Sequence, residues 1–140
     1  MARNYKYGKR SKLILSTVDA RLQEVCYRAQ EIANNADEDQ AIPDWGYHSG
    51  YRTKEDQQSR FKSGSSRADG VKNKSSHQFG LAVDFHASSR NGAFNQENLT
   101  IIAAVHLQAA GELGYVSKWG GLFTTLNDSP HFELIIEGIN

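Results

Sequence analysis

Two short stretches of the sequence contain the residue types that could bind a metal ion and activate water. Residues 75–84 read SSHQFGLAVD, and residues 128–134 read DSPHFEL. A metal site that activates water needs three protein ligands, an open fourth position and a nearby carboxylate that is not a ligand. His77, Asp84 and His131 have side chains of the ligand types, and Asp128 supplies a spare carboxylate. The helical His-Glu-x-x-His pattern is absent, so the ligands would come from separate strands and loops.

The pattern around these residues indicates how the backbone would position them. Apolar side chains alternate with small or polar ones over residues 79–86, which predicts a β-strand. Asp84 would share one face of this strand with Gly80 and Ala82, whose small side chains leave room for an ion. His77 would lie where a long loop meets the strand. His131 would begin a second strand, and the proline turn before it would aim Asp128 toward the metal.

These motifs resemble a known family when they are taken together. The S-x-H-x-x-G-x-A-x-D motif at residues 75–84, followed by D-x-x-H at residues 128–131, is similar to the D-alanyl-D-alanine carboxypeptidase family of zinc peptidases. That family includes phage L-alanyl-D-glutamate endopeptidases that serve as endolysins. The similarity also covers residues 49–53 (SGYRT), Gln57 and residues 119–121 (WGG), so that it spans nearly the whole chain.

The resemblance implies a role for each site residue. His77, Asp84 and His131 would hold one zinc ion per chain, and Asp128 would be the general base. Arg52 would reach into the site, bind substrate and stabilise the oxyanion. Ser75 and Trp119 are further expected substrate contacts. One departure is visible, because Leu122 and Phe123 follow the Trp-Gly-Gly segment where phage members often carry an aspartate and an aromatic residue.

The expected function is hydrolysis of the L-alanyl-D-glutamate bond in the stem peptide of bacterial peptidoglycan, by a phage endolysin that causes bacteriolysis. Two alternatives stay open at this point. The first is a D-alanyl-D-alanine carboxypeptidase. The second is a non-catalytic zinc-containing binding module, because the signalling domain of hedgehog proteins resembles this fold. Asp128 could also merely cap its turn, and Arg52 could pair with Asp44, Glu55 or Asp56 at the surface.

Periodicity predicts the elements that must carry these residues. Helices are expected over residues 16–34, 53–62 and 96–113, with Ser16 and Thr53 as N-cap residues. Strands are expected over residues 42–48, 79–86, 115–119 and 131–136, and a long polar loop over residues 63–76. The order of elements predicts one α+β domain over residues 1–140, with helices packed on a central antiparallel sheet. The family resemblance implies the fold of hedgehog and D-Ala-D-Ala peptidases.

Composition limits the partners and the setting. Lys+Arg and Asp+Glu both number 16, which disfavours a globally basic nucleic-acid-binding protein and leaves a local basic patch open, and no nucleic-acid partner is expected. A single cysteine, Cys26, allows no internal disulfide, and no apolar run predicts membrane insertion. The first residues, Met1 onward, contain no secretory signal. A monomer is expected, made in the host cytoplasm and released to the cell wall.

Three further histidines have less specific contexts. His106 lies beside the apolar stripe of the helix predicted over residues 96–113, so a buried core role is expected. His86 follows Asp84 by two residues on the same predicted face, and it would either support the site or face solvent. His48 precedes Arg52 and could line a cleft.

Overall fold

The computed structural model describes residues 3–89, 91–123 and 127–140. Four α-helices are found in this part of the chain: α1 (Lys9–Leu15), α2 (Ala20–Asn35), α3 (Lys54–Lys62) and α4 (Gln96–Glu112). The four strands are β1 (Trp45–Ser49), β2 (Ala82–Ala87), β3 (Val116–Trp119) and β4 (His131–Ile135). Two 3-10 helices, η1 (Ser76–Phe79) and η2 (Gly120–Leu122), precede β2 and follow β3.

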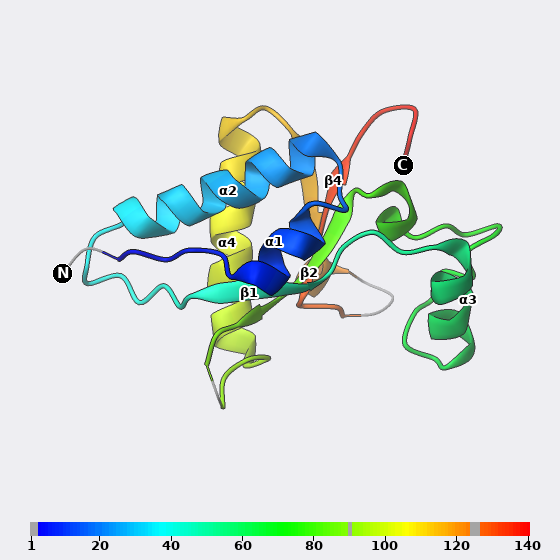
Figure 1. Ribbon diagram of the computed structural model, residues 1–140, viewed down its shortest axis with the longest axis horizontal. Coiled ribbons are helices and arrows are strands. Elements are labelled where there is room, and N and C mark those ends of the chain that lie inside the picture. The colour runs from blue at the N-terminus through cyan, green and yellow to red at the C-terminus, as the bar shows by residue number, and fades with distance from the viewer. Residues whose placement is uncertain (1–2, 90, 124–126) are drawn as a thin grey trace.

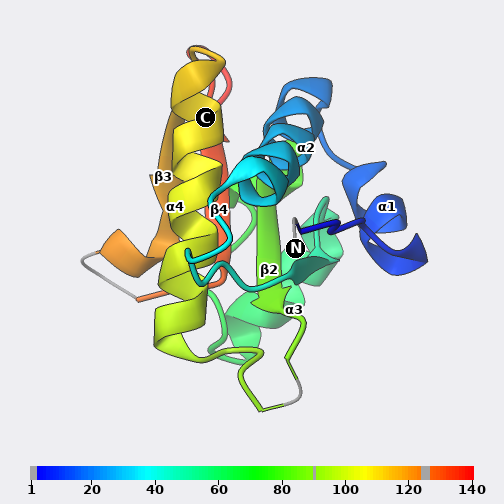
Figure 2. The same ribbon diagram turned by 90° about the vertical axis from the view of Figure 1, so that its left-hand side faces the viewer.

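The strands form one antiparallel sheet in the order β1-β2-β4-β3. Helices α2 and α4 pack side by side and cover one face of this sheet, as Figures 1 and 2 show. Helix α1 lies against β1, and α3 stands apart from the sheet beyond the end of β1 (Figure 1). The predicted α+β class with a central antiparallel sheet is therefore confirmed. The helix-free face of the sheet is left for polar side chains.

Strand alternation separates the core from this polar face. On β2, Val83 and Phe85 point toward the helices and are fully buried, and Phe132 and Leu134 do the same on β4. The intervening residues of both strands are polar and face the other side. Burial of the apolar face holds the register, because a slip by one residue would exchange the two faces.

The prediction for the first helix was wrong at its start. Ser16 does not begin a helix; it is the C-cap of α1, which the sequence analysis did not predict. Asp19 is instead the N-cap of α2, and its carboxylate accepts the backbone N–H of Arg21. Aspartate is as favourable an N-cap residue as serine, and the Asp19 side chain also forms an ion pair with Arg21. By contrast, the Thr53 cap is confirmed, since its hydroxyl accepts the N–H of Asp56.

The strand predicted from residue 79 begins three residues later, at Ala82. Residues 76–79 form η1, and Gly80 ends it in the left-handed conformation, with φ of 68°. Gly80 therefore does not share a strand face with Asp84, which corrects the sequence argument. The left-handed backbone favours glycine at this position, whereas a Cβ atom would make only ordinary contacts with the backbone of Val18 and Asp19. The other predicted strands and the helix that begins at Gln96 are confirmed to within a few residues.

Candidate active site

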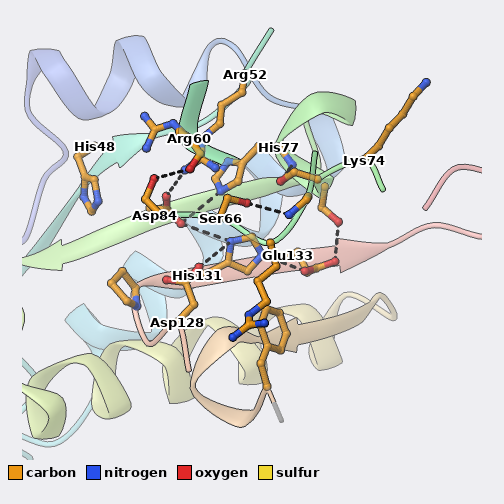
Figure 3. Close-up of a pocket in the computed structure, with 17 residues that line it drawn as sticks. His48, Arg52, Arg60, Ser66, Lys74, His77, Asp84, Asp128, His131 and Glu133 are labelled. Atoms are coloured by element: carbon orange, nitrogen blue, oxygen red, sulfur yellow. Dashed lines mark hydrogen bonds and ion pairs between the residues drawn. The ribbon is translucent and has the colours of Figure 1, made fainter. Parts of the chain in front are cut away.

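His77, Asp84 and His131 meet on the open face of the sheet, where Figure 3 shows them directed toward one another. Each offers one ligand atom, and these atoms all lie within 4.8 Å of one another. His77 Nε2 is 3.3 Å from Asp84 Oδ1, and His131 Nδ1 is 3.4 Å from the same oxygen. Three buried donor atoms around one point form a group that could hold a metal ion.

Two local features bring these residues together. Asp84 and His131 are directly opposite each other in the β2–β4 register, which places both side chains on the same face. His77 comes from η1, whose start is fixed by a capping box between Ser75 and Gln78. The sheet therefore sets two ligands, and a capped turn sets the third.

Hydrogen bonds fix which ring nitrogen faces the site. Nδ1 of His77 donates to the carbonyl oxygen of Gly50 at 2.7 Å, and this leaves the lone pair on Nε2. Nε2 of His131 donates to the carboxylate of Glu133 at 2.9 Å, and this leaves Nδ1 as the ligand atom. Outer partners of this kind orient metal-binding histidines. His77 Nε2 and Asp84 Oδ1 are buried without a hydrogen-bond partner among the described residues.

The electrostatics favour a charged Asp84. Burial alone would raise the pKa of Asp84, but the neighbouring His77 and His131 hold it well below its usual range. Burial also acts to lower the pKa of His131, yet the nearby carboxylates of Asp84 and Glu133 raise that pKa to about 9 in the metal-free protein. The carboxylates thus stabilise positive charge at this point, which in the metal-free protein is the proton on His131.

Arg52 is buried beside this group and does not pair at the surface. Its guanidinium group donates to Asp84 Oδ2 at 2.7 Å and to Gln57 Oε1 at 3.3 Å. The bond to Asp84 leaves Oδ1 directed at the two histidines. Burial lowers the pKa of Arg52, but the adjacent Asp84 carboxylate opposes this effect. Arg52 both orients a candidate ligand and lines the cleft.

Asp128 lies at the edge of the site, with Oδ2 3.8 Å from His131 Nδ1. The side chain is 43% exposed, and burial together with the Asp84 charge raises its pKa. Its turn is closed by hydrogen bonds from the His131 N–H to the Asp128 carbonyl and from the Asp128 N–H to the Gly120 carbonyl. A Cβ atom at Gly120 would clash with the Asp128 backbone, which explains the need for glycine there.

A cleft of about 490 Å³ surrounds these groups. It is lined by Arg52, Ser75, His77, Asp84, Asp128 and His131. Trp119 does not line it; the indole is buried and donates to the carbonyl of Ser129, supporting the turn that carries Asp128. Ser75 lines the cleft, but its hydroxyl also accepts the N–H of His77. Phe123 lies against the His131 ring with centroids 5.5 Å apart.

Sequence reasoning did not assign three residues that hold the site in place. Glu133 accepts hydrogen bonds from His131 and from the hydroxyl of Ser76. Gln57, fully buried, links Arg52 to Ser66 and to the carbonyl of Ala68. The Gly50 carbonyl orients His77. The contact between Glu133 and His131 could have been predicted from the sequence, because residues two apart in a strand share a face.

The remaining histidines are separate from the three candidate ligands. His106 is fully buried in the core, as predicted. His48 lines the cleft, and its Nδ1 lies 3.0 Å from Nδ1 of His86 on the neighbouring strand. Both are partly buried, and burial lowers the pKa of each, so neither is simply a solvent-facing side chain.

A two-histidine, one-aspartate cluster on an α+β sheet, with a further carboxylate at an open cleft, is the arrangement expected of a metallopeptidase. The chain belongs to the phage L-alanyl-D-glutamate peptidase family, whose model matches residues 3–135. The resemblance stated from the motifs is therefore confirmed.

The solved structures that are similar to this chain include two bacterial peptidases. The L-Ala D-Glu endopeptidase ChiX of Serratia marcescens has a TM-score of 0.76 at 27% identity, over 94% of this chain and 92% of its own. A mutant of the vancomycin resistance D,D-pentapeptidase VanY from a VanB-type cassette, in complex with Zn(II), has a TM-score of 0.56 at 20% identity. That match covers 84% of this chain and 72% of VanY, and it supports the fold. No curated protein sequence gives a significant match.

Proposed function

We propose that this chain is a zinc peptidase that hydrolyses the bond between L-alanine and D-glutamate in peptidoglycan stem peptides. His77, Asp84 and His131 are proposed as the ligands of one zinc ion. The observation that carries the proposal is the pair of buried atoms without hydrogen-bond partners, His77 Nε2 and Asp84 Oδ1, which face each other at 3.3 Å. Family membership supplies the bond that is cut.

The donor set fits zinc. Two imidazole nitrogens and one carboxylate oxygen match the mixed ligands of catalytic zinc sites, which keep a fourth position open. The cleft beside the cluster provides that access. When bound, zinc would lower the pKa of a coordinated water from about 15.7 to about 7 and polarise the peptide carbonyl.

The chain itself supplies proton transfer and charge stabilisation. Asp128 accepts the proton of the attacking water and passes it to the leaving amine. Its raised pKa and partial exposure suit this role, because a base must reach both water and substrate. Arg52 holds Asp84 and, from its place in the cleft wall, stabilises negative charge on the carbonyl oxygen.

The biological setting follows from the family. We propose a phage endolysin that acts as a monomeric domain over residues 1–140, made in the host cytoplasm and released to the wall. No helix in the described ranges is long and apolar enough to cross a membrane.

Digestion of purified peptidoglycan tests the proposal. The expected product has a new N-terminal D-glutamate, with L-alanine left on the muramic acid and the glycan strands intact. Release of free D-alanine alone would establish a D-alanyl-D-alanine carboxypeptidase instead. A zinc-loaded protein that releases neither product would be the non-catalytic binding module.

A further inference from the structure

A second cavity, of about 380 Å³, opens at the free edge of the sheet. Strand β3 pairs only with β4, and the cavity lies beside it, lined by residues of α4, β3 and the segment around η2. Six side chains form this lining: Leu107, Ser117, Lys118, Trp119, Leu122 and Phe123. We call this cavity the edge groove. None of its residues has a role in the proposed reaction.

The edge groove is continuous with the catalytic cleft through Phe123. This side chain lines both cavities, and its ring lies 5.5 Å from the His131 ring, measured between centroids. Because His131 is a proposed zinc ligand, Phe123 is one side chain away from the reacting atoms. A substrate chain that leaves the cleft over His131 and Phe123 therefore enters the edge groove.

The chemistry of the edge groove favours an uncharged occupant with apolar faces. Leucine, tryptophan and phenylalanine side chains make up most of its lining, and Lys118 is the only charged residue among the described ones. The adjoining β4 side of the cleft carries Asp128 and Glu133, as Figure 3 shows, and these carboxylates would repel an acidic group there. Other parts of the cleft wall are formed by polar residues of the loop before η1, among them Ser65 and Ser66.

The two sides of the scissile bond differ in the same way. After the bond, D-glutamate carries a second carboxyl group, free or amidated, and is followed by the charged remainder of the stem peptide. Before the bond, L-alanine is joined through a lactyl group to the sugar ring of N-acetylmuramic acid. This acyl side is uncharged, and the sugar ring presents apolar C–H faces together with hydroxyl and acetamido groups. The acyl side therefore matches the edge groove better than the D-glutamate side does.

The lengths also agree. L-Alanine and the lactyl group are two units of chain, which in extended form span about 7 Å at roughly 3.3–3.6 Å per unit. A carbonyl group held beside His131 thus places the sugar ring next to Phe123 and in the edge groove. Leu122 is 72% exposed there, so its side chain is accessible to an apolar face of the ring. Lys118 can donate hydrogen bonds to the polar groups of the sugar.

From these observations we infer that the edge groove is the subsite for the N-acetylmuramic acid residue attached to the L-alanine. The enzyme then prefers stem peptides that are still joined to muramic acid over stem peptides that lack the sugar. This inference rests on the proposed function and adds the specificity for the acyl side of the substrate. Burial of a few C–H groups of the sugar contributes enough for a roughly 10-fold preference.

The test compares two synthetic substrates that have the same stem peptide. One carries N-acetylmuramic acid on the L-alanine and the other carries only the lactyl group, so they differ in the sugar ring alone. For the wild-type enzyme, kcat/KM should be roughly 10-fold higher for the muramoyl substrate. Leu122→Ala removes an apolar contact and Leu107→Trp fills the groove, so in both variants the preference should fall toward parity through loss of rate on the muramoyl substrate. Leu13→Ala is the matched control, because Leu13 is 68% exposed on α1 and lines neither cavity.

The ratio of the two rates is measured on one preparation, so it does not depend on the fraction of folded enzyme. Equal cleavage of both substrates by the wild type would overturn the subsite and leave the proposed function intact. Variants that keep the wild-type preference would also overturn it. So would a wild-type dimer, seen by sedimentation, that Leu107→Trp dissociates, because a second copy of the chain would then occupy the groove. Failure to cleave either substrate or purified peptidoglycan would overturn the proposed function, and the subsite with it.

Discussion

Two groups of buried histidines in this protein differ in how their ring nitrogens are used. His106 in the core donates from Nδ1 to the Ile102 carbonyl at 2.8 Å and accepts at Nε2 from the Tyr47 hydroxyl at 2.6 Å. Its ring stacks on Phe85, and burial lowers its pKa to about 4. In His77, by contrast, only Nδ1 has a hydrogen-bond partner, and Nε2 is buried and unpaired.

The difference separates a structural histidine from a candidate ligand. A neutral imidazole has one donor and one acceptor, and a buried polar atom without a partner costs free energy. At His106 this cost does not arise, because both ring nitrogens have hydrogen-bond partners. At His77 the unpaired lone pair faces Asp84 and His131, where a cation would satisfy all three side chains.

The largest effect is expected from loss of a ligand. His77→Ala or His131→Ala should reduce zinc from about one ion per chain to none and should abolish activity, because metal binding is coupled to folding. Elemental analysis measures the zinc, and His48→Ala should retain it. Full zinc occupancy in His131→Ala would remove that residue from the site.

Asp128→Asn should separate catalysis from metal binding. The side chain keeps its shape but cannot accept a proton, so activity should fall by roughly 10²- to 10⁴-fold while zinc content stays near one per chain. Steady-state rates on purified peptidoglycan provide the measurement. Asp56→Asn, an exposed carboxylate on α3, is the matched control. A fully active Asp128→Asn enzyme would place the base at another carboxylate.

Zinc affinity should increase with pH, whereas the stability of the metal-free fold should decrease with pH. The pKa of His131 is raised from 6.5 to about 9 without metal. Its protonated form therefore stabilises the metal-free fold fully below pH 6.5, and this stabilisation is lost as the pH rises through 9. Zinc must displace the proton, so zinc affinity should increase about tenfold per pH unit below pH 9.

Chelator competition between pH 6 and 8 measures this slope, and thermal melts of the chelated protein measure the opposite trend. Asp84 has a lowered pKa and stays ionised throughout this window, so it contributes no slope of its own. A zinc affinity that does not change with pH would contradict a protonated His131 in the metal-free site.

The smallest effect is expected at His106. In His106→Phe an apolar ring of similar size retains the packing on Phe85 and Phe132, but two hydrogen bonds are lost. The free energy of unfolding should fall by about 1–3 kcal/mol, with zinc content unchanged. Urea denaturation measures the loss, and His106→Ala should cost more because it opens a cavity. A loss of zinc in His106→Phe would end the distinction between the two groups of histidines.

The sequence by itself determined the candidate ligands, the candidate base Asp128 and most of the elements. Ligand types recur at fixed spacing in residues 75–84 and 128–134, and strand alternation sets the face of each side chain locally. The amphipathic period of α2 and α4 and the Thr53 cap are also local, because they depend on residues within a few positions of each other. The same reasoning failed at Gly80, since a 3-10 turn and a strand can begin with similar residues.

Only the tertiary structure decided how those residues are used. Arg52 and Asp84 are 32 residues apart, yet their ion pair determines which Asp84 oxygen faces the histidines. The Gly50 carbonyl, 27 residues from His77, selects the free nitrogen of that imidazole, and no periodicity encodes such a pairing. The loop over residues 66–75 likewise takes its position from the hydrogen bonds of Gln57 and Asp69. Contacts of this kind form only when the packed sheet brings distant segments within hydrogen-bond range.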